Sequence, residues 1–133
     1  MALSYIKSYP PAEAKAREIC SGILPLYERY KAITRYISEN IVYDHVRKAT
    51  IAKKNGLPNI ERCWTLKMGI CLDIAALTVL MLRAVCVPCT LVVGWADGHY
   101  HAWVEARING TKYLYDHDDL NGRIKSYKKE RLY

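Results

Sequence analysis

The stretch Gly69–Arg83, Gly-Ile-Cys-Leu-Asp-Ile-Ala-Ala-Leu-Thr-Val-Leu-Met-Leu-Arg, decides how this chain folds. After Cys71 no Gly or Pro occurs before Pro88, and the Ala, Leu, Met and Arg residues in between favour a helix. The apolar side chains recur at three- and four-residue intervals and also fill much of the opposite side, which is typical of a buried helix. The sequence therefore predicts a central, buried helix that begins at or next to Cys71.

Cys71 falls where this helix would start. Unpaired backbone N–H groups and the positive end of the helix dipole favour a thiolate over a thiol at that place. Such a cysteine is a candidate nucleophile. Taken alone, such a residue is more simply interpreted as a buried cysteine of a core helix, and only the residues downstream favour the nucleophile.

The composition is that of an ordinary globular protein. The chain has 133 residues, of which 51% are hydrophobic and 25% charged, and we expect one domain spanning residues 1–133. No apolar run approaches the ~18 residues of a membrane helix, so no membrane span is expected. Residues 1–9 lack the apolar core of a secretion signal, which leaves a cytoplasmic protein or a trimmed secreted form as the alternatives.

The net charge of +7 does not by itself indicate a partner. Basic residues are spread over the chain rather than gathered in one stretch, and no finger, basic-zipper or aromatic RNA-binding motif accompanies them. Nucleic acid is therefore not expected as a partner, and attraction to acidic substrates or anionic surfaces stays open. The densest groups are Arg47-Lys48, Lys53-Lys54 and Lys125 with Lys128-Lys129 and Arg131.

The five cysteines form no regular framework, and their odd number leaves at least one free thiol in a monomer. Cys86-Val-Pro-Cys89 has redox-like spacing, but the pair follows a predicted helix and precedes a strand, whereas a thioredoxin-type pair begins a helix. A zinc site built from Cys63, Cys86, Cys89 and a histidine lacks a second paired spacing. We therefore expect no metal and no cofactor.

Two helices are predicted before the central one, followed by a polar segment that forms either a helix or a loop. Asn59 is suited to cap a short helical turn that leads into the central helix. The predicted elements are helices over Pro10–Cys20 and Pro25–Asn40, an extended piece over Ile41–Tyr43, the polar segment Asp44–Lys54, a break at Asn55–Pro58 and the turn through Leu66.

The second half of the chain reads as strands joined by tight turns. Asp97-Gly98 and Asn109-Gly110 are strong two-residue hairpin signals. The sequence therefore predicts an α+β fold, in which N-terminal helices and the central cysteine-bearing helix pack on an antiparallel β-meander. The predicted strands are Cys89–Trp95, Tyr100–Ile108 and Lys112–Asp116, with one more at Arg123–Tyr127.

His101 and Asp116 are the natural partners of a Cys71 nucleophile. Pairing about the second hairpin sets residues whose numbers sum to about 219 opposite each other, which brings Asp116 within one diagonal of His101. The carboxylate could then orient one ring nitrogen of His101 while the other faces Cys71. His99 and His117 are rival bases that we expect to be exposed.

Four motifs resemble those of the transglutaminase-like superfamily of papain-like cysteine enzymes, in its bacterial-type form. They occur in the expected order over Tyr30–Asp116, although Cys86 stands where the family has Gly and His117-Asp118 where it has Pro-Thr. The matching residues are the lead-in Ile41–Asp44, the cysteine motif Gly69–Ala84, the histidine motif Tyr100–Glu105 and the aspartate motif Tyr113–Asp116.

The resemblance implies a papain-like fold and a thioester mechanism, with Cys71 as nucleophile, His101 as base and acid, and Asp116 as the residue that orients His101. It also implies a peptide or protein substrate that carries an amide, and a peptidase or amidase is favoured. The alternatives are a protein-glutamine acyl transferase and a catalytically silent module that binds peptide or glycan. Besides the Cys71 N–H, the indole of Trp64 and the hydroxyl of Tyr43 are candidate oxyanion donors.

Overall fold

The computed structural model describes residues 5–46 and 57–133. Within them, helices come first and a four-stranded sheet follows, so the predicted α+β class is confirmed. The elements are α1 (Pro10–Ile19), α2 (Leu26–Asn40), β1 (Val42–Tyr43), α4 (Ile60–Leu66), β2 (Met68–Gly69), α5 (Cys71–Ala84), β3 (Cys89–Ala96), β4 (His99–Ile108), β5 (Thr111–Tyr115), the 3-10 turn η1 (His117–Asp119) and β6 (Tyr127–Leu132).

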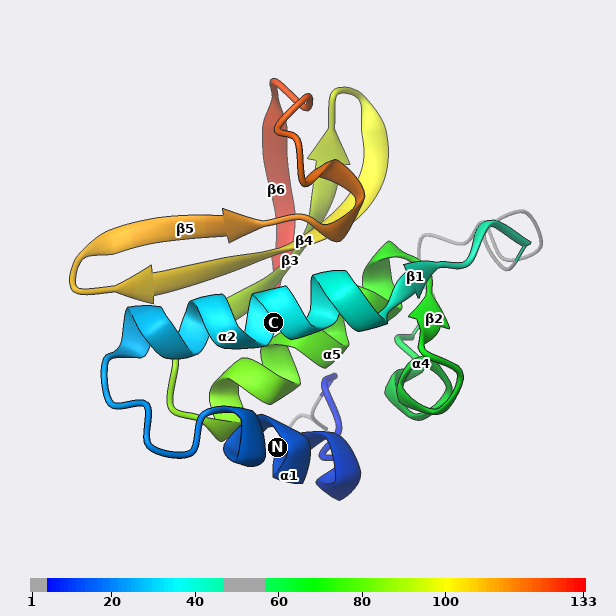
Figure 1. The fold of residues 1–133 in the computed structure, drawn as a ribbon. Coiled ribbons are helices and arrows are strands. Elements are labelled where there is room, and N and C mark those ends of the chain that lie inside the picture. The colour runs from blue at the N-terminus through cyan, green and yellow to red at the C-terminus, as the bar shows by residue number, and fades with distance from the viewer. Residues whose placement is uncertain (1–4, 47–56) are drawn as a thin grey trace.

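Helix α5 lies at the centre of the molecule, as predicted. It contacts α1, α2 and α4 as well as strands β3 and β4, and α2 crosses it under the sheet (Figure 1). Leu77, Met81 and Leu82 in its middle have no exposed surface. Because each such side chain contributes about 1.5–3 kcal/mol when it leaves water, the helix that carries Cys71 is fixed in the core.

The two predicted hairpins set the register of the sheet. Asn109 and Gly110 have φ angles of 52° and 81°, the left-handed values that a tight hairpin turn requires. The turn pairs Val104 with Tyr115, which matches the predicted register. Asp116 therefore directly follows Tyr115, the last paired residue of β5, and lies next to His101 of β4.

The last strand differs from the prediction. The sequence indicated a strand over Arg123–Tyr127, but β6 begins at Tyr127 and runs to Leu132. It pairs with β3 rather than with β5, so that the order of the sheet is β5-β4-β3-β6. The expected ladder is absent before Tyr127 because carboxylates of Asp97 and Asp119 hold the backbone N–H groups of residues 123–126 instead.

A short parallel ribbon leads into α5. Strand β1 pairs with β2 through Val42–Met68 and Tyr43–Gly69, a pairing that the sequence did not reveal. The predicted cap is confirmed, since Asn59 Oδ1 accepts a hydrogen bond of 3.0 Å from Arg62 N at the start of α4. Residues 47–56 lie outside the described part of the chain. They include most of the polar segment predicted over Asp44–Lys54 and the first half of the break predicted at Asn55–Pro58.

Aromatic stacking joins the two ends of the described chain. The rings of Tyr5 and Tyr133 are stacked with their centroids 3.8 Å apart. Tyr133 also exchanges backbone hydrogen bonds with Leu91 of β3, which extends the pairing of β6 to the last residue. No helix in residues 5–46 or 57–133 combines the length and the apolar character needed to cross a bilayer.

Candidate active site

Cys71 is the first residue of α5, and a buried carboxylate fixes the point where the helix begins. Asp73 Oδ2 accepts a hydrogen bond of 3.1 Å from Ile70 N, and Oδ1 accepts one of 2.9 Å from Asn59 N. Asp73 thus caps α5 and ties it to the start of α4. A Cβ on Gly69 would lie 2.9 Å from Asp73 Cβ, so only glycine lets the chain enter the helix this closely.

His101 and Asp116 lie together, at the distance that the hairpin register predicted. His101 Nε2 is 2.9 Å from Asp116 Oδ1 and 2.8 Å from Oδ2, and the side chains are 10% and 1% exposed. His101 lies near the start of β4, and Asp116 follows directly after β5. The contact is therefore set by the pairing of two neighbouring strands rather than by a loop.

The histidine ring is held in its charged form. Burial lowers the pKa of His101, but hydrogen bonds with Asp116 and with the thiol group of Cys71 outweigh it and raise the pKa from 6.5 to about 10. Because Nε2 is bound to Asp116, Nδ1 is the ring nitrogen left to meet Cys71. The arrangement can hold a thiolate beside an imidazolium, which is the form in which a cysteine attacks a carbonyl.

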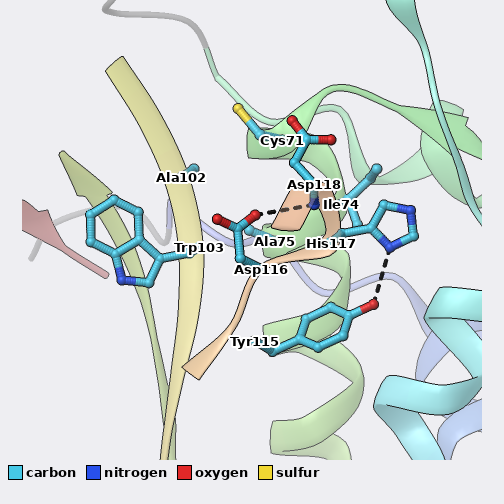
Figure 2. A pocket seen from close by; sticks show the side chains of 9 residues that line it. All are labelled: Cys71, Ile74, Ala75, Ala102, Trp103, Tyr115, Asp116, His117 and Asp118. Atoms are coloured by element: carbon cyan, nitrogen blue, oxygen red, sulfur yellow. Dashed lines mark hydrogen bonds between the residues drawn. The ribbon is translucent and has the colours of Figure 1, made fainter. Parts of the chain in front are cut away.

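Cys71 is half-buried, and its sulfur lies at the edge of a small pocket. Figure 2 shows Cys71 from α5 and Asp116 and Asp118 from the segment after β5 around this pocket. The pocket has a volume of about 10 Å³, which is room for about one water molecule. A ligand larger than water would therefore lie across Cys71 on the surface, not inside the pocket.

Two further donors hold the Asp116 carboxylate. Asp118 N donates to Oδ1 at 3.1 Å, and the hydroxyl of Tyr127 donates to Oδ2 at 3.0 Å. Sequence reasoning missed Tyr127, because nothing in the polar stretch after residue 118 signals that it returns to the site. Its ring also packs on Trp103, with centroids 4.7 Å apart.

The two candidate oxyanion residues differ in their surroundings. A hydrogen bond joins the Tyr43 side chain to the backbone of Cys71. Burial and the charges of Cys71 and Asp118 raise the pKa of Tyr43, so its hydroxyl keeps its proton. Trp64 lies in α4 and packs against the ring of Tyr36, with the Lys67 ammonium 3.5 Å from the indole centroid.

His117 is not exposed, contrary to expectation. It is half-buried, and its Nδ1 lies 3.0 Å from the hydroxyl of Tyr115, a contact also drawn in Figure 2. Tyr115 is in turn 2.9 Å from Ser38 Oγ on α2, and His117 also forms a hydrogen bond with the backbone of Ile41. Burial lowers the pKa of His117, so this histidine anchors the segment after β5 as a neutral ring. His99 is exposed, as expected.

Glu105 has a structural role in the sheet. Its carboxylate is buried and lies 2.6 Å from Lys129 Nζ on β6, while the Trp103 indole donates to it at 3.5 Å. This cluster joins β4 to β6 across β3. It therefore supports the strand that carries Tyr127.

The other cysteines are free thiols. Cys86 is exposed, and Cys89 is half-buried, where burial raises its pKa to about 11 despite the nearby Arg83. A thiol with so high a pKa is a poor redox nucleophile, which speaks against a dithiol site. Among the described residues, no group of three or more His, Cys, Asp and Glu side chains is placed to hold a metal ion.

Comparison with known proteins matches the model of the transglutaminase-like superfamily to residues 13–116. A candidate cysteine protease from Cytophaga hutchinsonii superposes with a TM-score of 0.72 at 24% identity, over 98% of this chain and 44% of that one. A candidate protease from Parabacteroides distasonis gives 0.66 at 18% identity, over 80% and 23%.

A structure described as a TGase gives a TM-score of 0.61 at 15% identity, over 92% of this chain and 32% of that one. No significant match occurs among curated proteins. At these identities the superpositions show a common fold, which bears out the expected transglutaminase-like architecture. The chain spans less than half the length of these three structures.

Proposed function

Because the chain belongs to the transglutaminase-like superfamily, we propose that it is a cysteine enzyme that cleaves amide bonds of peptides or proteins through a thioester. The observation that carries the proposal is the contact of His101 Nε2 with the Asp116 carboxylate at 2.8 Å, beside a half-buried Cys71 at a helix start. Nucleophile, base and orienting group are the three parts that such chemistry requires.

Each of the three residues takes one step of the reaction. The Cys71 thiolate attacks the amide carbonyl carbon, and the proton on His101 passes to the leaving amine as the C–N bond breaks. A water molecule then gives a proton to His101 and attacks the thioester, which releases the carboxylic acid and restores the thiolate. Asp116 keeps the ring oriented and stabilises its positive charge throughout.

The developing oxyanion needs donors, and Tyr43 is the better supported of the two predicted side chains. The Cys71 N–H at the helix start already donates to the Tyr43 oxygen, so the two candidate donors lie side by side. The Tyr43 hydroxyl retains its proton and can turn that proton toward the oxygen. Loss of one oxyanion donor costs about 10²–10³-fold in turnover. Tyr43→Phe should therefore lower kcat by up to about that factor. For Trp64, an oxyanion role stays a prediction.

Hydrolysis is favoured over acyl transfer on the likeness to two candidate proteases, while the likeness to a TGase keeps transfer as the second candidate. The two activities differ only in whether water or an amine resolves the thioester. A glutamine-containing peptide incubated with a labelled amine separates them, because only transfer attaches the label to the peptide.

Limiting iodoacetamide at pH 6 tests the nucleophile, because ordinary thiols are almost fully protonated at that pH. Peptide mapping should find label on Cys71 and not on Cys86, which is exposed and serves as the internal control. His101→Gln should abolish this selectivity. Equal labelling of the two cysteines in the wild-type protein would contradict the proposal and favour a binding module.

A further inference from the structure

The C-terminal strand brings one residue into the candidate site. Tyr127 is the first residue of β6, and its hydroxyl donates to Asp116 Oδ2 at 3.0 Å. The residues that match the family model end at 116, so Tyr127 lies outside the part of the chain that carries the family pattern. Its contact with Asp116 is therefore a feature of this chain's own return segment.

The placement of Tyr127 is fixed from both sides. The Asp97 carboxylate accepts hydrogen bonds from Lys125 N at 3.1 Å and Ser126 N at 2.8 Å, and Asp97 N donates to Ser126 O at 2.8 Å. The next residue, Tyr127, pairs with Ala96 at the end of β3. Hydrogen bonds on both sides therefore hold the backbone at Tyr127 in place.

Asp116 needs such a donor because it is almost completely buried. An ionised carboxylate with 1% of its side chain exposed depends on hydrogen bonds to replace its lost hydration. His101, Asp118 N and the Tyr127 hydroxyl supply them, and Tyr127 is the one that reaches Asp116 from the far edge of the sheet. Burial and the charge of Asp116 raise the pKa of Tyr127, so the hydroxyl remains a donor at any working pH.

The same hydroxyl affects how strongly Asp116 acts on His101. A carboxylate that accepts from several donors spreads its charge among them and offers less of it to each one. Because Tyr127 and His101 share Oδ2, removing one donor strengthens the bond to the other. The ring of Tyr127 also covers Trp103, two residues from His101 on the same strand.

We propose that Tyr127 is a positioning residue of this site: its hydroxyl holds the Asp116 carboxylate in place and shares the charge that Asp116 directs at His101. The importance of this contact for turnover rests on the proposed function. The contact itself and its effect on the imidazole do not.

Tyr127→Phe tests the contact, because it removes the hydroxyl and keeps the ring on Trp103. NMR of protein with ¹⁵N-labelled histidine reports the Nε2–H proton of His101 at neutral pH, identified by its loss in His101→Gln. In Tyr127→Phe this proton should move downfield, since a carboxylate with fewer donors binds the imidazole more tightly. If the chain is an enzyme, kcat should also fall about tenfold with little change in KM, as for the loss of one hydrogen bond to a charged group.

Tyr113→Phe is the matched control. Tyr113 lies on β5, is half-buried like Tyr127 and packs against Tyr27 and Tyr30 through its ring. It should leave the His101 resonance and kcat unchanged. A His101 proton that stays in place or moves upfield in folded Tyr127→Phe overturns the inference, whether or not peptides are cleaved. A downfield shift in a protein without cysteine selectivity supports the contact and counts only against the proposed function.

Discussion

Replacing His101 by glutamine should change how the free energy of unfolding depends on pH. The pKa of His101 is raised from 6.5 to about 10 by the side chains of Asp116 and Cys71, against the opposing effect of burial. A group whose pKa is raised in the folded state stabilises that state fully below the unfolded pKa and loses the contribution as pH rises through the folded value. The stabilisation by His101 is therefore complete below pH 6.5 and declines toward pH 10.

The magnitude follows from the width of this window. Where the folded protein holds one proton that the unfolded chain has released, stability falls by about 1.4 kcal/mol for each pH unit. Up to about pH 8.5, the ordinary cysteine pKa, the Cys71 thiol of the unfolded chain still holds the proton that the folded thiolate has released, so this proton and the one on His101 offset each other. Between pH 8.5 and pH 10 the wild-type protein should thus lose about 2 kcal/mol more than His101→Gln, which has no titrating ring at this position. Only 10% of the His101 side chain is exposed, so solvent screening removes little of the effect.

Urea unfolding of both proteins at a series of pH values and constant ionic strength measures this difference. On a Cys71→Ala background the loss should begin at a lower pH, because no thiolate then offsets the proton on His101. It should also end at a lower pH, because the thiol is one of the groups that raise the His101 pKa. A difference between wild type and His101→Gln that is flat from pH 8.5 to 10, or a wild-type protein that loses less stability than the variant over this range, would refute the charged imidazole.

Three other substitutions probe how the site is held. Asp116→Asn should lower kcat about 10³–10⁴-fold while the fold survives, as seen by circular dichroism, because a neutral amide cannot stabilise the imidazolium. Gly69→Ala should cost about 1–3 kcal/mol in urea unfolding, since the new Cβ would lie 2.9 Å from Asp73 Cβ and 3.0 Å from Cys63 Sγ. Gly94→Ala should disrupt the pairing of β3 with β6, because its Cβ would overlap the Lys128 carbonyl oxygen. Amide exchange should then speed up in β6 and much less in β5. Equal protection of β6 in the wild-type protein and in Gly94→Ala would count against this reasoning.

The central helix and the His101–Asp116 contact were predictable because local signals determine them. The run from Cys71 to Ala84 has no helix breaker, and its side chains from residue 73 to residue 82 are all buried. The turn at Asn109-Gly110 allows a single close register, and that register carries Asp116 to His101. Where a two-residue turn fixes a ladder, simple counting along the strands locates the residues that meet.

The return of β6 could not be predicted from such signals. Its residues, Tyr-Lys-Lys-Glu-Arg-Leu, show no alternation of apolar and polar side chains, and most of them are exposed. The strand is placed by contacts that are distant in sequence: the Asp97 carboxylate on residues 125 and 126, and the Lys129–Glu105 ion pair. For the same reason the burial of His117 escaped notice, since it depends on Tyr115 and on the backbone of Ile41 from another part of the chain.

A cysteine motif, a histidine motif and an aspartate motif supply the reacting groups, but they do not by themselves satisfy the buried Asp116 carboxylate. Of the donors that it uses, only His101 belongs to a motif, whereas Asp118 N and Tyr127 come from the segment that follows. An ionised carboxylate left with one donor in the interior would be costly, and it would either take up a proton or draw in water. The residues after 116 are thus part of the proposed catalytic geometry, and variation there should change the strength of the proposed base without altering Cys71, His101 or Asp116.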